Sequence, residues 1–260
     1  MGRIEAAFSE LRQQGKKGFI PFITAGDPDL ETTAELLVEL SGATVIELGV
    51  PFSDPMADGP VIQRASERAL KHGFGIGDVL ETVASVRRSI ETPIILFSYF
   101  NPLLQFGLKR LAAEAKAAGV DGVLVTDLSP EESGEFESEL RAHDLDMIFL
   151  IAPTSTDERL KLVAQHARGF IYAVSRAGVT GVRTSVSAEA EKLINRMRRF
   201  SSLPIAVGFG ISNLEQVKDV QRYADAVVIG SAIVAEIERL EGATADLARR
   251  IGEFVKKFSD

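Results

Sequence analysis

Two carboxylates stand out because of where they fall in the chain. Glu47 interrupts the apolar run Val45–Val50, and Asp58 lies in the turn-rich segment that follows it. Side chains alternate along a strand, so Glu47 points away from the bulky face that Ile46 and Leu48 form. A buried carboxyl group has a raised pKa, which suits it to proton transfer. The pair predicts acid–base chemistry, with a salt-bridged structural glutamate and a turn-forming aspartate as the alternatives.

Glycine pairs near the end of the chain indicate a phosphate site. Gly208-Phe209-Gly210 ends one apolar run and Gly230-Ser231 ends the next. Glycine lets backbone N–H groups approach an oxyanion closely, and barrel enzymes often bind phosphate after strands seven and eight. The Gly-punctuated segment 175–185 is placed to act as a lid that excludes water. Ordinary turns are the alternative for the glycine pairs, and a surface loop is the alternative for the segment 175–185.

The residues that are missing narrow the reaction further. Every lysine falls in a helical pattern or in a loop outside the expected strands, which disfavours an imine mechanism. The three histidines are scattered over helical segments and there is no cysteine, so a metal site is disfavoured. Carboxylate acid–base chemistry on a phosphorylated small molecule is what remains.

The elements that must position these groups recur along the whole chain. Eight short apolar runs are typical of parallel strands covered on both faces: Phe19–Thr24, Val45–Val50, Ile94–Tyr99, Gly122–Asp127, Met147–Ala152, Phe170–Ser175, Ile205–Gly208 and Ala226–Ile229. Helical patterns lie between them, at Leu30–Leu40, Leu103–Ala118, Glu131–His143, Asp157–Ala167, Ala188–Phe200, Leu214–Tyr223 and Thr244–Phe258. This order predicts an α/β fold, a (β/α)₈ TIM barrel with an extra N-terminal helix, as a single domain over residues 1–260. An open doubly wound sheet is the alternative, but the first strand is not followed by a G-x-G-x-x-G turn.

Charge and hydropathy exclude some partners. The net charge is −8 and no basic run exceeds two residues, so nucleic acid and anionic membrane surfaces are disfavoured. No apolar run approaches the ~20 residues that cross a bilayer. The first residues form an amphipathic helical pattern rather than a signal peptide. We therefore expect a cytoplasmic protein.

The segment Ile46–Pro60, with the sequence IELGVPFSDPMADGP, resembles the signature of tryptophan synthase α chains. Four further segments resemble that family in the same order: PFITAGDP at 21–28, YFNP at 99–102, SRAGVTG at 175–181 and GFGIS at 208–212. The resemblance covers essentially the whole chain.

This resemblance implies a retro-aldol lyase of tryptophan biosynthesis that cleaves 1-C-(indol-3-yl)glycerol 3-phosphate to indole and D-glyceraldehyde 3-phosphate. It implies that Glu47 is the general acid–base and that Asp58 binds the indole N–H and stabilises the developing positive charge. The phosphate-binding residues would be Gly181, Gly210, Gly230 and Ser231, and Thr180 in the lid would bond the second carboxylate on closure. The indole would lie among Phe22, Phe97, Tyr99, Leu124, Ile151, Tyr172 and Phe209, all of which would otherwise be assigned to the core. Phe97 is bulkier than the Leu or Met expected at its position.

The resemblance also implies a partner. Such chains pair with a pyridoxal-phosphate-dependent β chain in an αββα heterotetramer, so this chain would hold no cofactor itself. The residues expected to face the β chain are Pro51, Asp54, Asn101 and Pro102. A subunit that chiefly binds and activates the β chain, with low activity alone, is an alternative. Another phosphosugar barrel is a further alternative, but it is not expected to carry the segment from Glu47 to Pro60.

Overall fold

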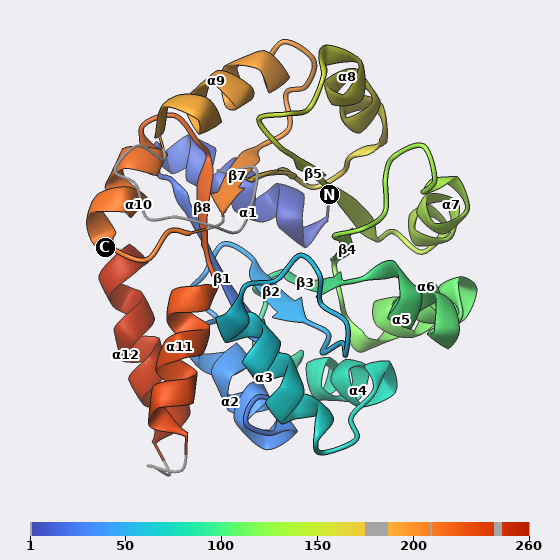
Figure 1. Ribbon diagram of the computed structural model, residues 1–260, viewed down its shortest axis with the longest axis vertical. Helices are drawn as coiled ribbons and strands as arrows, with labels where there is room; N and C mark the ends of the chain where they lie inside the picture. Colours follow the sequence, from blue (N-terminus) through green and yellow to red (C-terminus); the bar gives the residue numbers. More distant parts are fainter. Residues whose placement is uncertain (1, 175–186, 209, 242–245, 260) are drawn as a thin grey trace.

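The computed structural model describes residues 2–174, 187–208, 210–241 and 246–259. Within these ranges eight parallel strands form a closed barrel in sequence order, because the first strand also pairs with the last (Figure 1). This confirms the predicted (β/α)₈ barrel. The strands are β1 (Gly18–Thr24), β2 (Ile46–Gly49), β3 (Ile94–Ser98), β4 (Gly122–Val125), β5 (Asp146–Ile151), β6 (Ile171–Val174), β7 (Ile205–Gly208) and β8 (Ala226–Ile229).

Helices surround the barrel and connect successive strands. They are α1 (Arg3–Gln14), α2 (Leu30–Glu39), α3 (Pro60–Leu70), α4 (Ile76–Val86), α5 (Phe100–Phe106), α6 (Leu108–Ala118), α7 (Gly134–Ala142), α8 (Asp157–His166), α9 (Ser187–Met197), α10 (Leu214–Gln221), α11 (Ser231–Leu240) and α12 (Leu247–Ser259). None of those in the described ranges is long and apolar enough to span a membrane.

The helix predicted over Leu103–Ala118 is in fact two helices. Gly107 separates them with a φ of 95°, a backbone conformation that L side chains rarely adopt. The first helix, α5, also begins earlier than predicted, at Phe100. Three other helices begin at a side-chain cap, because Asp29, Thr156 and Asn213 each accept a hydrogen bond from the backbone N–H three residues on.

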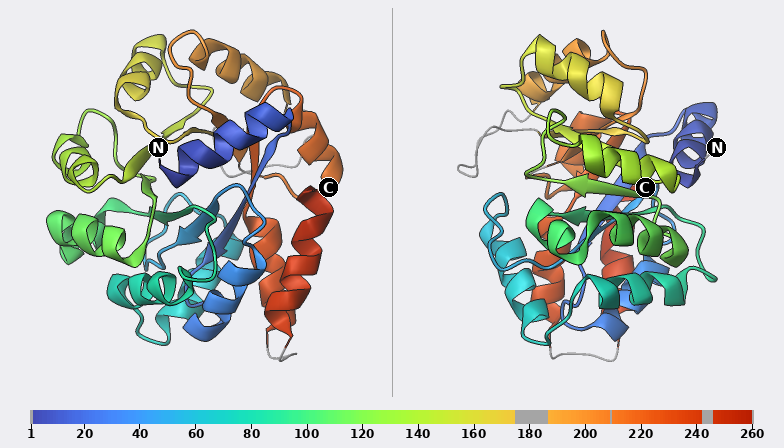
Figure 2. Two further views of the ribbon diagram at one scale, coloured as in Figure 1. Left: turned by 180° about the vertical axis from the view of Figure 1, so that it is seen from behind. Right: turned by 90° about the vertical axis from the view of Figure 1, so that its right-hand side faces the viewer.

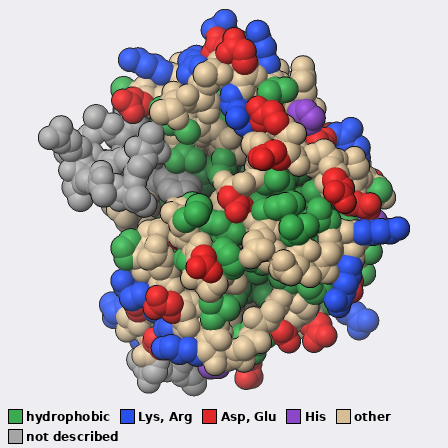
Figure 3. Space-filling model, turned by 45° about the vertical axis from the view of Figure 1, so that its right-hand side comes forward, with side chains coloured by type: hydrophobic (Ala, Val, Ile, Leu, Met, Phe, Trp, Pro, Cys, Tyr) green, Lys and Arg blue, Asp and Glu red, His purple; other side chains and the backbone are tan. Residues whose placement is uncertain are grey.

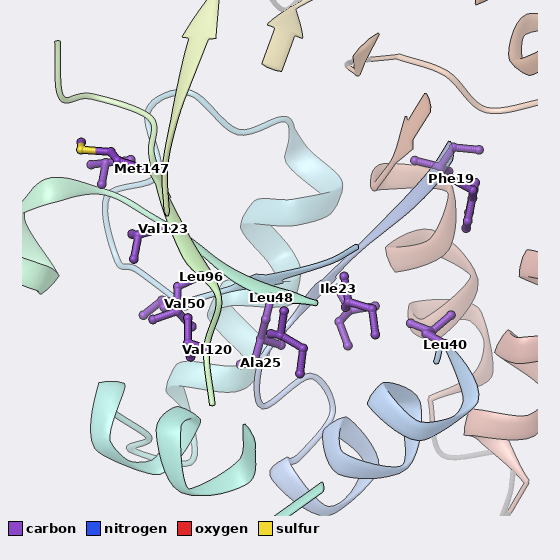
Figure 4. Packing of buried hydrophobic residues seen from close by; sticks show 14 of the residues in the cluster. Phe19, Ile23, Ala25, Leu40, Leu48, Val50, Leu96, Val120, Val123 and Met147 are labelled. Carbon is purple, nitrogen blue, oxygen red and sulfur yellow. The ribbon is translucent and has the colours of Figure 1, made fainter. Parts of the chain in front are cut away.

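The outer face of the barrel carries the larger apolar layer. Alternate strand residues pack there against the helices, and Figure 4 shows Ile23, Leu48 and Leu96 of three successive strands in this layer. The strand residues that alternate with these outward-facing ones form a separate cluster inside the barrel. Glu47 pairs in register with Phe22 and Ile95, both members of the inner cluster, so its side chain lies on the inner face as predicted.

Helix α1 closes one end of the barrel. It lies across the back of the barrel in the left view of Figure 2. Its Ile4 and Phe8 belong to the inner cluster, and the rings of Phe8 and Phe170 are 5.8 Å apart. Arg3 Nη1 donates a 3.0 Å hydrogen bond to Asp121 Oδ1, which ties the start of the helix to the segment before β4. The inner cluster is thereby shielded from water at this end.

An ion-pair network joins three elements near the carboxyl ends of the strands. Arg68 of α3 donates two hydrogen bonds, of 2.8 and 2.9 Å, to the buried carboxylate of Asp27 in the loop after β1. Arg68 and Arg64 also bind Glu238 of α11, and the hydrogen bond from Arg64 lowers the pKa of Glu238 to about 2. Helix α3 follows Asp58 almost directly, so the network fixes that helix to its neighbours.

Because α1 packs against the inner cluster, we expect a large loss of stability when the ring of Phe8 is removed. Phe8→Ala is expected to lower the free energy of unfolding by about 3–5 kcal/mol, because it leaves a cavity under the barrel. Urea unfolding followed by circular dichroism measures this change. Gln13→Ala, on the exposed face of the same helix, is the matched control and should shift the value by less than about 0.5 kcal/mol. Equal effects of the two variants would show that α1 is not part of the core.

Candidate active site

Glu47 lies buried in β2, two residues before the strand ends at Gly49. Neither carboxyl oxygen has a hydrogen-bond partner among the described residues. Burial raises the pKa of Glu47 well above its ordinary value, because a charged carboxylate loses its hydration there. A neutral carboxyl group with no fixed partner can give a proton to a bound ligand and take one back.

Asp58 lies in the loop that leaves β2. The loop turns back on itself, since the Asp58 backbone N–H donates to the Pro55 carbonyl over 3.0 Å. On the other side, the Gln63 side chain of α3 donates to the Asp58 carbonyl over 2.8 Å. Turn and helix together fix the aspartate at the entrance to the barrel, so the turn-forming reading of this segment and a functional role are compatible.

Tyr99 links Asp58 to its own loop. The Tyr99 hydroxyl donates to Asp58 Oδ2 over 3.1 Å and accepts a 2.8 Å hydrogen bond from the Ala57 N–H. Burial raises the pKa of Asp58 to about 6, although the Tyr99 hydrogen bond opposes the shift. Asp58 therefore changes charge close to neutral pH, and the pKa of Glu47 is likewise shifted upward by its burial.

Tyr172 lies within the electrostatic range of both carboxylates. Burial raises its pKa well above the ordinary value, and the negative charges of Glu47 and Asp58 raise it further. Its hydroxyl comes so close to β7 that a Cβ at Gly208 would lie 2.0 Å from it. The first glycine of the Gly208–Gly210 pair therefore makes room for this ring, whereas the sequence pattern alone indicates a phosphate site.

The predicted indole residues divide between the two faces of the barrel. Phe22, Phe97, Leu124 and Tyr172 share the inner cluster, and the rings of Phe22 and Phe97 meet edge to face at 5.2 Å. Tyr99 lies beside them, at Asp58. Gly49 accommodates the ring of Phe22, because a Cβ there would lie 2.6 Å from it. These residues form an aromatic wall next to the two carboxylates.

The prediction for Ile151 is wrong by one residue. Ile151 pairs with Ala173 and belongs to the outer layer, where it packs toward the helices. Leu150 pairs with Tyr172 and packs against the inner cluster, so it is the β5 residue that faces the site. Because the whole run from Met147 to Ile151 is apolar, its pattern carries no signal of which residues point inward.

Two of the predicted phosphate residues begin a helix. Gly230 is the N-cap of α11 and Ser231 is its first residue, so free backbone N–H groups lie at this point. Gly210 has a φ of 81°, and nothing lies within 4 Å of where its Cβ would be. Gly181, Thr180 and Phe209 lie outside the described residues.

The predicted partner residues lie in two segments at the carboxyl ends of β2 and β3. Asp54 and Asn101 are exposed, Pro102 is half-buried and Pro51 is buried. Two large apolar side chains in the same segments were not singled out from the sequence, Met56 with 83% and Leu104 with 50% of their surface exposed. The sequence signal for Met56 is an apolar residue inside a polar turn. For Leu104 it is an apolar residue on the outer face of a short helix.

Figure 3 shows one side of the molecule, where hydrophobic side chains gather toward the middle and Lys and Arg side chains lie mostly around the outline. In the described ranges no three His, Cys, Asp or Glu side chains form a group that could hold a metal ion. The chemical groups that the site offers are thus two carboxyl groups, two tyrosine hydroxyls, an aromatic wall and a helix N-terminus.

Comparisons with known proteins agree with this geometry. A family model described as tryptophan synthase alpha chain matches residues 8–260. The tryptophan synthase alpha chain of Geobacter sulfurreducens is 50% identical over 257 residues, which are 98% of this chain and 97% of that protein.

Solved structures agree as well. The crystal structure of the alpha subunit from Legionella pneumophila has a TM-score of 0.90 at 39% identity, over 100% of this chain and 97% of that one. A chain of the tryptophan synthase α2β2 complex of Pyrococcus furiosus has a TM-score of 0.86 at 40% identity, over 93% and 97% of the two chains. The chain with these two buried carboxyl groups belongs to the tryptophan synthase alpha chain family.

Proposed function

We propose that Glu47 and Asp58 carry out the lyase reaction of this α subunit, the cleavage of 1-C-(indol-3-yl)glycerol 3-phosphate to indole and D-glyceraldehyde 3-phosphate in tryptophan biosynthesis. One observation carries the proposal: the Glu47 carboxyl group is buried inside the barrel and has no hydrogen-bond partner among the described residues. Such a group is unfavourable for folding unless a ligand uses it.

The raised pKa gives Glu47 the right starting state. The protonated carboxyl group transfers its proton to C3 of the indole ring, which produces a positively charged indolenine. The resulting carboxylate then accepts the proton of the adjacent glycerol hydroxyl, and the carbon–carbon bond breaks as its electrons return to the ring. Indole and the aldehyde leave, and Glu47 is again protonated. The ring itself accepts the electrons, so the step needs neither an imine nor a metal.

Asp58 supplies the opposite charge. A negative carboxylate next to the ring N–H stabilises the indolenine cation. This electrostatic stabilisation is larger in a site with little water than at the surface. Tyr99 holds the Asp58 carboxylate from one side. This role requires the ionised form, in contrast to the protonated form that Glu47 needs at the start.

Substrate binding follows from the other groups. The indole is placed against Phe22, Phe97, Leu124, Leu150 and Tyr172, and the phosphate at the start of α11, on the backbone of Gly230 and the hydroxyl of Ser231. Gly210, Gly181, Phe209 and Thr180 complete the phosphate, indole and lid residues of the proposal.

The α chain of this family holds no cofactor, and pyridoxal phosphate belongs to the β chain. We propose that the β chain docks on the segments around Asp54 and Asn101, where Met56 and Leu104 expose apolar surface. The same exposure supports a second role, the activation of that partner with low turnover by the isolated chain. Turnover measured with and without the β chain separates the two. We further propose one domain over residues 1–260 and a cytoplasmic location.

Glu47→Gln tests the acid–base assignment. The amide keeps the size of the side chain but cannot exchange a proton, so kcat is expected to fall by at least about 10³-fold. The Kd of indolepropanol phosphate, measured by calorimetry, should stay within about threefold. Near-full activity of the variant would remove Glu47 from the mechanism.

The same variant has a thermodynamic signature. Glu47 takes up a proton on folding, because its pKa is raised in the folded state above that of the unfolded chain. Its contribution to stability is therefore complete below about pH 4.5 and is lost as the pH rises toward the folded-state pKa, by up to about 1.4 kcal/mol per pH unit. Urea unfolding of the wild type and Glu47→Gln from pH 5 to 8 measures the difference between their free energies of unfolding. As the pH rises, this difference should change in favour of the variant. A difference independent of pH would mean that the carboxyl group is not desolvated.

The pKa of Asp58 predicts how kcat falls on the acid side of its pH profile, called the acid limb below. Because its pKa is about 6 and the charged form is required, kcat should fall as the pH drops below 6. Asp58→Asn should lower kcat by about 10²–10³-fold and abolish this limb. In Tyr99→Phe the carboxylate loses a donor, so the limb should move to higher pH. An unchanged limb in Asp58→Asn would assign it to another group.

A further inference from the structure

A small cavity lies on one side of Asp58, between β1, β2, β3 and α3. Its volume is about 10 Å³, which leaves room for a single water molecule. Among the residues that line it are Thr24, Asp58, Ser66 and Tyr99. Polar side chains of four different segments therefore line one pocket, next to Phe22 and Phe97 of the aromatic wall.

Thr24 is the unexplained member of this group. It is 2% exposed, and its hydroxyl has no hydrogen-bond partner among the described residues. Valine has nearly the same shape and is equally suited to a strand, so a buried hydroxyl without a partner is unfavourable here unless something binds it. The cavity that Thr24 lines is where that ligand can lie.

The other groups around the cavity limit what the ligand does. Tyr99 donates its one hydroxyl proton to Asp58 Oδ2, and its oxygen accepts from the Ala57 N–H. The second carboxylate oxygen, Asp58 Oδ1, accepts no hydrogen bond from the described residues. A water in the cavity can accept from or donate to Thr24 and Ser66 and still donate to Asp58, which gives it the two to four partners that a buried water needs.

We propose that Thr24 is a positioning residue of this active site, holding one water molecule that hydrogen-bonds the Asp58 carboxylate. Tyr99 and this water then bind the two sides of the carboxylate, so that its orientation toward the substrate is fixed before binding. The inference deepens the proposed function and rests on it for the kinetic consequence, but the water and its effect on Asp58 exist independently of catalysis.

A hydrogen bond to the charged form favours ionisation. Thr24→Val, which removes the hydroxyl at constant shape, should therefore raise the pKa of Asp58 and move the acid limb of kcat up by about half to one pH unit. At pH 6 kcat should fall by about threefold while KM changes by less than about twofold. Thr24→Ser should restore the limb, because it keeps the hydroxyl.

Two further readouts separate this inference from the mechanism. A ¹³C-NMR titration of the Asp58 carboxyl group measures the same pKa shift without any turnover, and a high-resolution crystal structure should contain the water in the wild type and in Thr24→Ser but not in Thr24→Val. Thr82→Val is the matched control, since the Thr82 hydroxyl bonds the Asp78 carbonyl on α4. It should leave the kinetics and the titration unchanged.

An unchanged Asp58 titration in Thr24→Val, a water that persists in that variant, or failure of Thr24→Ser to restore the wild-type value would each overturn the inference. A shifted titration with an unshifted kinetic limb would instead keep the water and remove Asp58 from the chemistry, which is a failure of the proposed function.

Discussion

The structure depends on the burial of one carboxyl group inside a closed sheet. Strand side chains alternate, so a barrel with helices on its outer face must place every second residue inside. At position 47 that residue is a glutamate, and no described side chain or backbone group compensates it. The loss of hydration keeps the group protonated, and the proton makes it an acid. The fold thus creates the reactivity through desolvation alone, at a cost to its own stability.

The remaining features keep this environment dry and aligned. Helix α1 fills one end of the barrel with Ile4 and Phe8, so the acid is separated from water on that side. At the other end the Asp27–Arg68–Glu238 network connects the loop after β1 with α3 and α11. Since α3 follows Asp58 and α11 begins at Ser231, this network connects the second carboxylate with the proposed phosphate site through two helices.

The two carboxyl groups divide the work because their surroundings differ. Glu47 has only apolar strand neighbours in register, and its pKa rises far. Asp58 keeps the Tyr99 hydroxyl as a donor, so its pKa rises only to about 6. The raised pKa of Glu47 favours the acid form, and Asp58 is an anion above about pH 6, which is the combination that protonating a ring and stabilising the resulting cation requires.

How far the sequence predicts this arrangement depends on contrast between neighbouring residues. Glu47 could be assigned to the inner face because a charged residue alternates with bulky apolar ones. In β5 the residues from Met147 to Ile151 are all apolar, so the pattern does not distinguish Ile151 from Leu150, which packs against the inner cluster. Gly107 could not be recognised as a break because the apolar spacing continues across it, and Thr24 gave no signal because threonine is common in strands. Gly208 looked like part of a phosphate loop, since only the folded chain brings Tyr172 against it.

The most direct test of this account is the protonation state of Glu47 in the resting enzyme. Infrared difference spectroscopy of the wild type against Glu47→Gln, with ¹³C-labelled glutamate, distinguishes a protonated carboxyl group from a carboxylate at pH 7. We expect a protonated band that belongs to Glu47 and persists at pH values well above the ordinary pKa of glutamate. A carboxylate band at pH 7 that titrates near the ordinary glutamate value would contradict it.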